Sequence, residues 1–512
     1  MKKFLGLSGL LVALFAVGCG PVGDQSGSTG DEGGANANDR SSGNGDSELL
    51  ETGAMAVSPT GDYIVARRNT TTLIVDVKGS SLTELPLAAE RFLFAKSKNV
   101  VYVVLPDREG VVALDLGSTK ELWRSEPIFE AEARTVLARL SDDDRMLLLA
   151  DDSRVLFLDS ETGDIRFATS SAAGIVDLDL LPGGKSAIAV GTTRWEDGGP
   201  HTPVSLVPLD GSASKTIDVP NCAAPIAIVE NGSRALLSPT FCTPSAELRK
   251  QGWSNPDPVS VIDIDASKNE LSFVKNLPGF GPVALLGGTA VAYLDTKRMD
   301  PAMFSNPAQV PGKDAKQFQL MTIDPKSLAF DLHPVGDTLP RFAPSKDGKS
   351  LLVDASVSVE RTEMGGDVKA SIELTPDGQL EAQVTVGAFG DASGSLFGVW
   401  TLDSKHYTPF QGPAASLDRF VQIADGSQVF TLKNNGRGGD LYSIDLAARA
   451  SFDLGMSLRD IAILPDGKTL VLRVRLEPTA DGYLREDFCF SLDARTCVST
   501  VHYQSPTPQH DP

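Results

Sequence analysis

Residues that carry most enzyme chemistry are thinly spread in this chain of 512 residues. Its five histidines are far apart in the sequence, and an isolated histidine is more often a packing or surface residue than a catalytic one. They are His201, His333, His406, His502 and His510. The motifs of serine hydrolases, zinc proteases, P-loop proteins and dinucleotide-binding proteins are absent from the sequence. The sequence therefore predicts no catalytic residue and no cofactor.

The densest group of carboxylates could suggest a calcium site. Asp142, Asp143 and Asp144 are followed by Asp151 and Asp152. A calcium loop of the EF-hand type needs alternating ligands in the order D-x-D-x-D-G, and this spacing is missing. We interpret the group as two solvated turns, and the sequence predicts no metal site.

These acidic turns belong to a pattern that repeats along the chain. The clearest copy reads VLARL-SDDD-RMLLLA-DDS-RVLFL-DSETGD-IRFA and covers residues 136–168. Short runs rich in Val, Leu, Ile and Phe between polar turns are typical of strands, so each unit should be a four-stranded antiparallel meander. Units recur from Gly53 with a period of about 50 residues. An Asp closes the third strand of each unit and is expected to bond backbone amides of the next turn. These residues are Asp76, Asp115, Asp159, Asp210, Asp263, Asp324, Asp403, Asp445 and Asp493.

The units resemble bacterial β-propeller blades of the WD-like and YVTN-like kind. The matching segments are AVSPTGDYIVA, FAPSKDGKSLLVDA and AILPDGKTLVLRV. The resemblance implies an all-β fold with a single propeller of four-stranded antiparallel blades over residues 53–502. Nine units can be counted, but one has a weak turn and the seventh is overlong, with an extra hairpin-like piece over residues 368–386. We therefore favour eight blades, with seven and nine as alternatives. Two smaller propellers or a β-sandwich array are the other architectures considered.

The N-terminus resembles the signal of bacterial lipoproteins. Lys2 and Lys3 precede an apolar stretch over residues 4–17, which is too short to span a bilayer. Small residues before Cys19 resemble the lipobox, which implies a signal peptide over residues 1–18 and lipid, including palmitate, on Cys19. Gly20 is not the Asp that retains such proteins in the inner membrane, so the resemblance points to the outer membrane. The alternative is ordinary secretory cleavage that leaves a free Cys19.

Residues 19–52 are rich in Gly, Ser, Asn and Asp and form the predicted flexible linker behind this anchor. Such a coil has an r.m.s. end-to-end distance of ~30 Å. The body is expected in the periplasm or at the cell surface, and residues 503–512 are expected to be a disordered tail.

Four further cysteines suit an exported protein. Cys222 and Cys242 lie on either side of the turn at Asn231, and Cys489 and Cys497 lie on either side of the turn at Asp493. Facing strands of a hairpin approach closely enough for a disulfide. We predict both pairs, Cys222–Cys242 and Cys489–Cys497, and the alternative is four buried thiols.

Loop lengths give the best indication of a binding site. The long connections join second to third strands, and in a propeller these loops share one face of the disc. They cover residues 192–202, 239–257, 296–316, 357–394, 433–439 and 476–486. Several carry residue types that are favoured at interfaces. The candidate partner-binding residues are Trp195, Arg249, Trp253, Met299, Met303 and Phe304. The alternative is that these side chains pack under their own loops.

The net charge of −21 argues against nucleic acid as a partner and against electrostatic docking on anionic lipid. The sequence favours a membrane-anchored envelope lipoprotein, attached through Cys19, whose propeller is a non-catalytic scaffold for unidentified envelope proteins. One alternative is a propeller enzyme of the lactonase or quinone-dependent dehydrogenase type. Another is a binder of a small carbohydrate or peptide.

Overall fold

The computed structural model describes most of the chain between residues 55 and 504. The described residues are 55–68, 70–106, 110–128, 137–150, 154–170, 174–196, 199–239, 258–336, 341–345, 348–354, 368–374, 380–386, 395–412, 420–434, 439–445, 450–476 and 485–504. All described residues belong to one compact unit, Asp39–Thr240 with Pro256–Pro512.

The first five strand groups of this unit are antiparallel meanders of four principal strands, here called blades 1 to 5. They comprise β1 (Met55–Val57), β2 (Tyr63–Arg68), β3 (Thr71–Asp76) and β4 (Ser81–Leu85); β5 (Arg91–Phe94), β6 (Val100–Val104), β7 (Val111–Asp115) and β8 (Lys120–Arg124); β9 (Leu137–Leu140), β10 (Met146–Ala150), β11 (Arg154–Asp159) and β12 (Ile165–Ser170); β13 (Ile175–Leu180), β14 (Ser186–Gly191), β16 (Gly199–Pro208) and β17 (Lys215–Val219), with the short β15 (Arg194–Glu196) beside β16; and β18 (Ala223–Val229), β19 (Arg234–Pro239), β20 (Val259–Asp265) and β21 (Glu270–Leu277). A 3₁₀ turn, η4 (Glu230–Gly232), joins β18 to β19.

The remaining strands form blades 6 to 9 and one separate hairpin. They comprise β22 (Phe280–Leu286), β23 (Thr289–Asp295), β24 (Phe318–Ile323) and β25 (Phe330–Gly336); β26 (Arg341–Pro344), β27 (Ser350–Asp354), β30 (Ser395–Thr401) and β31 (His406–Gly412); the hairpin β28 (Val368–Leu374) and β29 (Leu380–Val386); and β32 (Phe420–Gln422), β33 (Gln428–Asn434), β34 (Gly439–Asp445), β35 (Ala450–Ile463), β36 (Leu470–Leu476), β37 (Arg485–Ser491) and β38 (Cys497–Gln504). The 3₁₀ turns η5 (Pro301–Met303) and η6 (Pro307–Gln309) lie between β23 and β24.

Strand β35 serves two blades. At its start Ala450 is opposite Asp445 of β34, and at its end Ile463 is opposite Leu470 of β36. It is therefore the fourth strand of blade 8 and the first strand of blade 9, which joins both into one seven-stranded sheet. Apart from the β28–β29 hairpin, the described strands form eight sheets, one of which contains two blades, so the favoured count of eight blades is not the one observed. Counted as four-stranded groups they are nine, the higher alternative.

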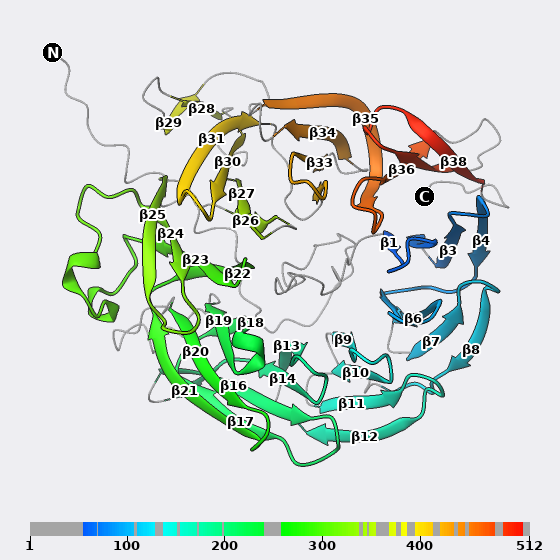
Figure 1. The fold of residues 1–512 in the computed structure, drawn as a ribbon, viewed down its shortest axis with the longest axis horizontal. Coiled ribbons are helices and arrows are strands. Elements are labelled where there is room, and N and C mark those ends of the chain that lie inside the picture. The colour runs from blue at the N-terminus through cyan, green and yellow to red at the C-terminus, as the bar shows by residue number, and fades with distance from the viewer. Residues whose placement is uncertain are drawn as a thin grey trace. The chain divides into compact units, whose positions relative to one another are not determined.

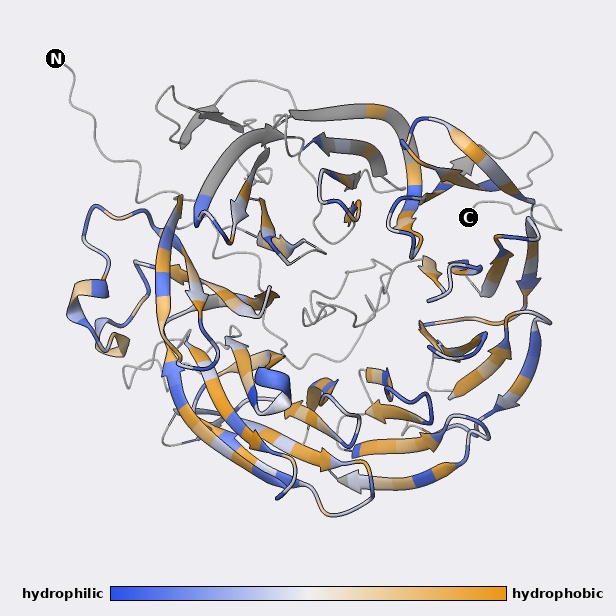
Figure 2. Cartoon of the chain, viewed as in Figure 1, coloured by the Kyte–Doolittle hydropathy of each residue, from blue (hydrophilic) through white to orange (hydrophobic). Residues whose placement is uncertain are grey.

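The blades follow one another around a ring, with β1, β9, β13, β18 and β22 among the strands nearest its centre (Figure 1). Apolar side chains fill the space between successive blades, because a blade placed between two others buries both of its faces. Strand β10, for example, reads MLLLA and is buried at four of its five residues. Outermost strands such as β8, which reads KELWR, are mostly exposed. Hydrophobic residues accordingly line the strands of the ring, and many turns are hydrophilic (Figure 2).

The last blade packs against the first. One buried cluster includes Ile64 and Val75 from blade 1 together with Phe488 and Val501 from blade 9. Strand β1 is the inner edge of blade 1 and β38 is the outer edge of blade 9. Among the described strands, none from one end of the chain adds to the sheet of the other end. Side-chain packing therefore closes the ring, and the predicted all-β propeller of four-stranded blades is confirmed.

The strand-closing aspartates act mostly as predicted. The carboxylate of Asp159, for example, accepts hydrogen bonds from the backbone N–H groups of Glu161 at 2.7 Å and Thr162 at 3.2 Å. The same pattern of bonds to the following turn occurs at Asp76, Asp115, Asp210, Asp324 and Asp493. Blade 5 differs, because Asp263 pairs with Arg234 and Asp265 caps the turn instead.

Candidate binding face

All six predicted connections join the second to the third principal strand of a blade, but the one in blade 8 is not long. It spans only residues 435–438, because β33 and β34 extend into the predicted loop, and it is shorter than the connection over residues 105–110 in blade 2. The six connections run from β14 to β16, β19 to β20, β23 to β24, β27 to β30, β33 to β34 and β36 to β37. They belong to six consecutive blades, numbers 4 to 9. The face of the ring on which they emerge follows from the turns at the other ends of the same strands.

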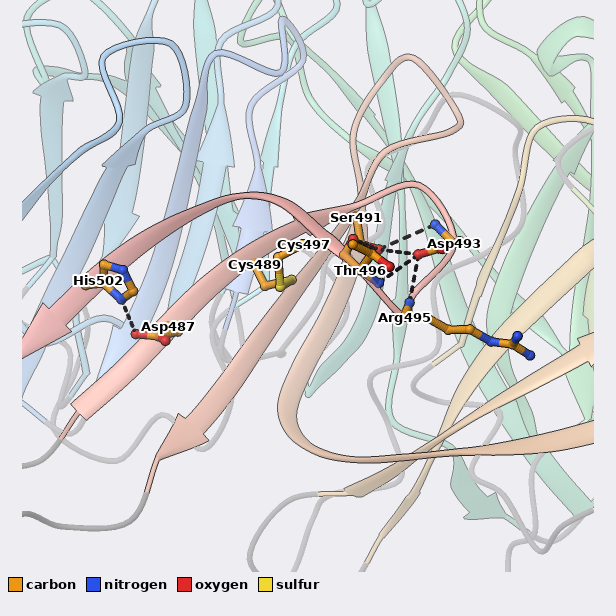
Figure 3. Close-up of a disulfide and its surroundings, with 8 residues drawn as sticks. All are labelled: Asp487, Cys489, Ser491, Asp493, Arg495, Thr496, Cys497 and His502. Carbon is orange, nitrogen blue, oxygen red and sulfur yellow. Dashed lines mark hydrogen bonds and ion pairs between the residues drawn. A yellow bond between two sulfur atoms is a disulfide. The ribbon is translucent and has the colours of Figure 1, made fainter.

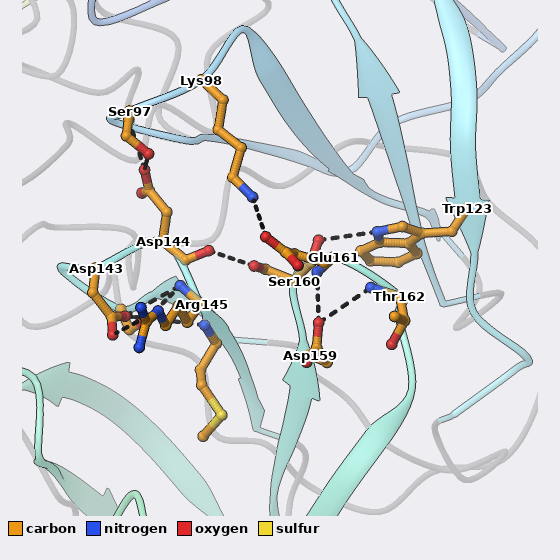
Figure 4. Close-up of polar contacts among 12 residues, drawn as sticks. Ser97, Lys98, Trp123, Asp143, Asp144, Arg145, Asp159, Ser160, Glu161 and Thr162 are labelled. Carbon is orange, nitrogen blue, oxygen red and sulfur yellow. Dashed lines mark hydrogen bonds and ion pairs between the residues drawn. The ribbon is translucent and has the colours of Figure 1, made fainter.

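The turns between first and second strands contact one another from blade to blade. Asp144, in this turn of blade 3, accepts hydrogen bonds from the backbone N–H groups of Lys96 at 2.9 Å and Ser97 at 2.6 Å, in the same turn of blade 2 (Figure 4). The backbone carbonyl of Asp144 accepts from the Ser160 hydroxyl, and the Ser160 carbonyl in turn accepts from Trp123 Nε1 of blade 2 at 3.0 Å. These bonds lock the two neighbouring turns together.

Close approaches of glycine turns extend this contact around the ring. A Cβ atom added at Gly61 of blade 1 would lie 2.9 Å from Pro465 of blade 9. Equivalent contacts join blades 3 and 4, 4 and 5, 6 and 7, and 8 and 9, through Gly184 with Asp142, Gly232 with Pro182, Gly348 with Gly287, and Gly467 with Ala424. Together with the bonds of Asp144, these contacts involve every blade, so the first turns share one face. Because the strands are antiparallel, the second-to-third connections leave on the opposite face, which we call the long-loop face.

The connection between β23 and β24 is the longest one that is described throughout. The buried Asp295 accepts a hydrogen bond from the backbone N–H of Lys297 at 3.0 Å, and its carbonyl accepts from Met299 N–H at 2.9 Å. Asp300 and Asn306 then cap η5 and η6 by accepting from the N–H groups of Ala302 and Ala308. Such capping fixes the backbone locally. The loop is therefore preorganised rather than held only at its ends.

A cavity of about 280 Å³ lies at the base of this loop. Its lining residues are Thr296, Lys297, Met299, Pro311, Gly312, Lys313, Ala315 and Gln317. The Lys297 ammonium donates to Gln317 Oε1 at 2.6 Å, whereas Lys313 is exposed. The cavity combines apolar walls with cationic groups at its edge, a combination suited to a small ligand or to an inserted side chain.

The structure corrects the prediction that Phe304 presents an exposed aromatic surface. Only 6% of Phe304 is exposed, and its ring packs edge-on against Phe330 with centroids 5.7 Å apart. Met299 packs against the same hydrophobic cluster while also lining the cavity. Phe304 therefore belongs to the core beneath the loop. The sequence could not show this, because its packing partner Phe330 lies beyond the loop, at the start of β25.

Of the other predicted binding residues, the structure places Trp195 and Met303 but not Arg249 and Trp253. Trp195 is half-buried in β15, opposite Pro200 of β16, and Met303 is half-buried in η5. Both lie on second-to-third connections. Arg249 and Trp253 lie outside the described residues, so their role stays a prediction.

The disulfide Cys489–Cys497 is present and joins β37 to β38 with Cα atoms 5.4 Å apart (Figure 3). The two residues are not directly opposite, because Cys489 faces Thr500 and Ser491 faces Cys497. The bridge is thus diagonal across a bulged hairpin. Cys222 is fully buried and disulfide-bonded, but Cys242 lies outside the described residues, so their pairing stays a prediction. Cys19 also lies outside them.

The inner strands carry a charge cluster that sequence reasoning missed. Arg139 of β9 lies 3.9 Å from carboxylate oxygens of Asp177 and Asp179 on β13. Asp177 also accepts a hydrogen bond from the backbone N–H of Ile226 in blade 5 at 2.8 Å. Burial raises the pKa of Asp177 more than Arg139 lowers it. The cluster links three blades, and only the alignment of inner strands could have revealed it.

His333 and His502 lie outside this cluster and have contacts of their own. His333 contacts Thr322 Oγ1 at 3.2 Å and packs near the Trp400 ring, and burial lowers its pKa. His502 Nδ1 lies 2.7 Å from Asp487 (Figure 3). Within the parts that the structure describes, no three His, Cys, Asp or Glu residues are placed to bind a metal ion. No helix there has the length and apolar character needed to cross a bilayer.

No protein-family model and no curated protein matches the chain. Among solved structures, the dihydro-heme d1 dehydrogenase NirN in complex with DHE is similar with a TM-score of 0.44 and 11% identity, over 88% of this chain and 75% of NirN. The C-terminal WD40 domain of Sif2 gives 0.40 and 8%, over 82% of this chain and 91% of that domain. Kluyvelomyces marxianus Hsv2 gives 0.37 and 9%, over 72% and 96%. Because these scores are below 0.5, the β-propeller assignment rests on the strand pairing itself.

Proposed function

We propose that this protein is a membrane-anchored lipoprotein of the cell envelope whose β-propeller is a non-catalytic scaffold for protein binding or assembly. One observation carries the proposal, namely that the long connections of blades 4 to 7 and of blade 9 leave on a single face. A rigid ring with loops of different lengths on one side is a common way to build a binding surface. On the opposite side the turns are short, and contacts between blades hold them in place.

The anchor and the linker fit this role. A lipidated Cys19, followed by the acidic, glycine-rich linker over residues 19–52, would hold the propeller at an r.m.s. distance of ~30 Å from a membrane surface and leave it free to rotate. A scaffold with such a tether reaches partners in the envelope and keeps its long-loop face accessible.

The cavity beneath the loop of residues 296–317 gives a second candidate function. Its volume of about 280 Å³ is close to the lower end of the range for small-molecule sites. A peptide side chain or a small carbohydrate could be bound there, with the exposed Lys313 at its edge.

Two measurements on the full-length protein test the proposal. Cys19→Ser should move the protein from the membrane fraction to the soluble fraction of the envelope, because no acyl chain can be attached. Partners recovered with the intact protein should be lost from a double variant, Trp195→Ala with Met303→Ala. The variant Lys185→Ala, on the short-turn face, is the control. If Cys19→Ser still pellets with membranes the anchor is excluded, and equal recovery by all variants would exclude the proposed face.

A further inference from the structure

The loop over residues 296–317 is a basic segment in an acidic protein. The whole chain has 46 basic and 67 acidic residues and a net charge of −21. This loop instead has a net charge of +2, from four basic and two acidic residues. They are Lys297, Arg298, Lys313 and Lys316 on one side and Asp300 and Asp314 on the other. An anionic group is therefore attracted to this loop, although the protein as a whole repels it.

Two of these cations line the cavity at the base of the loop. Lys297 and Lys313 are both exposed, and both belong to the lining of the cavity. The Lys297 ammonium donates to the neutral amide oxygen of Gln317, another lining residue, at 2.6 Å. An ammonium group has three donors. This bond therefore holds the positive charge at the cavity wall and leaves donors for a ligand.

A buried carboxylate sets the direction of the Gln317 amide. Asp295 is 6% exposed, and its carboxylate accepts from Gln317 Nε2 at 3.4 Å and from the backbone N–H of Lys297 at 3.0 Å. The amide nitrogen of Gln317 therefore faces Asp295, and the amide oxygen faces the Lys297 ammonium. Because this partner is neutral, no ion pair within the described residues compensates the charge of Lys297.

The rest of the lining distinguishes between classes of ligand. Met299, Pro311 and Ala315 supply apolar walls, and none of the described lining residues is aromatic or acidic. Sugar hydroxyls need acceptors, and the Gln317 oxygen already accepts from Lys297. A carboxylate only accepts hydrogen bonds, and its bonds with ammonium groups are charge-assisted. The volume of about 280 Å³ also suits one side chain or chain end, because sites for whole small molecules usually span roughly 300–1,000 Å³.

We propose that this cavity binds a carboxylate of a partner peptide. Lys297 pairs with the carboxylate, Lys313 adds a second positive charge at the edge, and the apolar part of the inserted group contacts Met299 and Pro311. This inference rests on the proposed binding role of the long-loop face and names the chemistry of its partner, a protein segment with a carboxylate next to apolar residues. An acidic side chain and a free C-terminus share this chemistry, and the peptides below separate the two.

The test measures the binding of three short labelled peptides to the full-length protein by fluorescence anisotropy. All have the same apolar flanking residues. The first has a central Glu and blocked ends, the second a central Gln and blocked ends, and the third a central Gln and a free C-terminal carboxylate. The first or the third should bind about tenfold more tightly than the second, because charge-assisted hydrogen bonds replace neutral ones. The peptide with this advantage identifies the source of the carboxylate.

Matched lysine variants place this preference in the cavity. Lys297→Met should remove most of the advantage of the charged peptide, and Lys313→Met should reduce it less, because an exposed charge at the edge is screened by solvent. Lys185→Met, on the short-turn face, is the control and should keep the full advantage. The melting temperature of each variant checks that its fold is intact. Equal affinities of the wild-type protein for all three peptides, or no binding of any, would overturn the proposal whether or not Lys297→Met folds. So would an advantage that persists in folded Lys297→Met.

The outcome is separable from that of the partner-recovery test. If the double variant Trp195→Ala with Met303→Ala loses its partners but the peptides bind equally, the binding face stands and the carboxylate site is refuted. If the charged peptide is preferred but the double variant keeps its partners, the carboxylate site stands and the proposed scaffold face is refuted.

Discussion

The Asp144 carboxylate accepts hydrogen bonds from both the backbone N–H and the hydroxyl of Ser97, each at 2.6 Å, although the two residues belong to different blades. Asp144 is 2% exposed and has a positive φ of 58° in its turn. Its side chain therefore joins two blades by hydrogen bonds, as backbone groups join neighbouring strands within one sheet (Figure 4). Contacts of this kind on the short-turn face keep successive blades in a fixed orientation and leave the other face free for long loops.

Asp144→Ala should lower the free energy of unfolding by about 1–3 kcal/mol, because the buried carboxylate loses its hydrogen bonds to the exposed Lys96 and Ser97 of blade 2. The matched control is Asp142→Ala. Asp142 lies in the same turn, and its carboxylate forms an exposed ion pair with Lys96 at 3.0 Å, which should contribute less than about 1 kcal/mol. The contact with Gly184 involves the Cβ and backbone N of Asp142, which Ala keeps. Urea unfolding of both variants measures the difference. Equal losses would show that the bonds between blades contribute nothing specific.

Phe304→Ala should destabilise the protein by about 3–5 kcal/mol, because a buried aromatic ring leaves a cavity when it is removed. Met303→Ala, one residue away and half-buried, should cost clearly less. Differential scanning calorimetry of the two variants checks this order. If Phe304→Ala had the same melting temperature as the wild type, Phe304 would not be a core residue and its burial beneath the loop would be refuted.

Acid should destabilise the propeller through its turn aspartates. The hydrogen bond to Ser118 lowers the pKa of Asp115, the contact with Arg166 lowers that of Asp159, and backbone N–H bonds lower that of Asp493. A carboxyl with a lowered folded pKa stabilises above its unfolded value of about 3.9, and this contribution is lost as pH falls through the folded pKa.

Asp177 should have the opposite dependence on pH. Its raised pKa means that its contribution to stability falls as pH rises above about 4, through the folded pKa. The free energy of unfolding of Asp159→Asn, measured from pH 3 to pH 8, should depend less on pH at the acid end than that of the wild type. The free energy of unfolding of Asp177→Asn should rise above the wild-type value toward neutral pH. Identical pH profiles for both variants and the wild type would contradict these assignments.

Thiol labelling should find no reactive cysteine in the mature body. Cys489 and Cys497 are bonded, and Cys222 is also disulfide-bonded. Intact mass after alkylation without reduction should show no label, and reduction should expose the four thiols of Cys222, Cys242, Cys489 and Cys497. Labelling of Cys242 in the unreduced protein would refute the predicted pair Cys222–Cys242.

Much of the fold could be predicted because it is local. A meander is built from neighbouring strands, so apolar runs, turn residues and strand-closing aspartates such as Asp159 each leave a mark within a few residues. The blade count was less accessible, since the weak Gly287–Gly288 turn and the extra hairpin β28–β29 made one unit resemble an insertion, whereas blades 6 and 7 are both four-stranded. The candidate site divides in the same way. Loop lengths predicted the long-loop face, whereas the burial of Phe304 and the pairing of Arg139 with Asp177 depend on residues that are distant in sequence.

The central claim, that partners bind on the long-loop face, is tested most directly by photo-crosslinking in the cell envelope. A crosslinking amino acid placed at position 313, at the edge of the cavity, is compared with one placed at position 185, in the short first turn of blade 4. Both positions carry exposed lysines, so neither replacement should disturb the fold. We expect a discrete protein adduct from position 313 and none from position 185. An adduct from position 185 with none from position 313 would contradict the account.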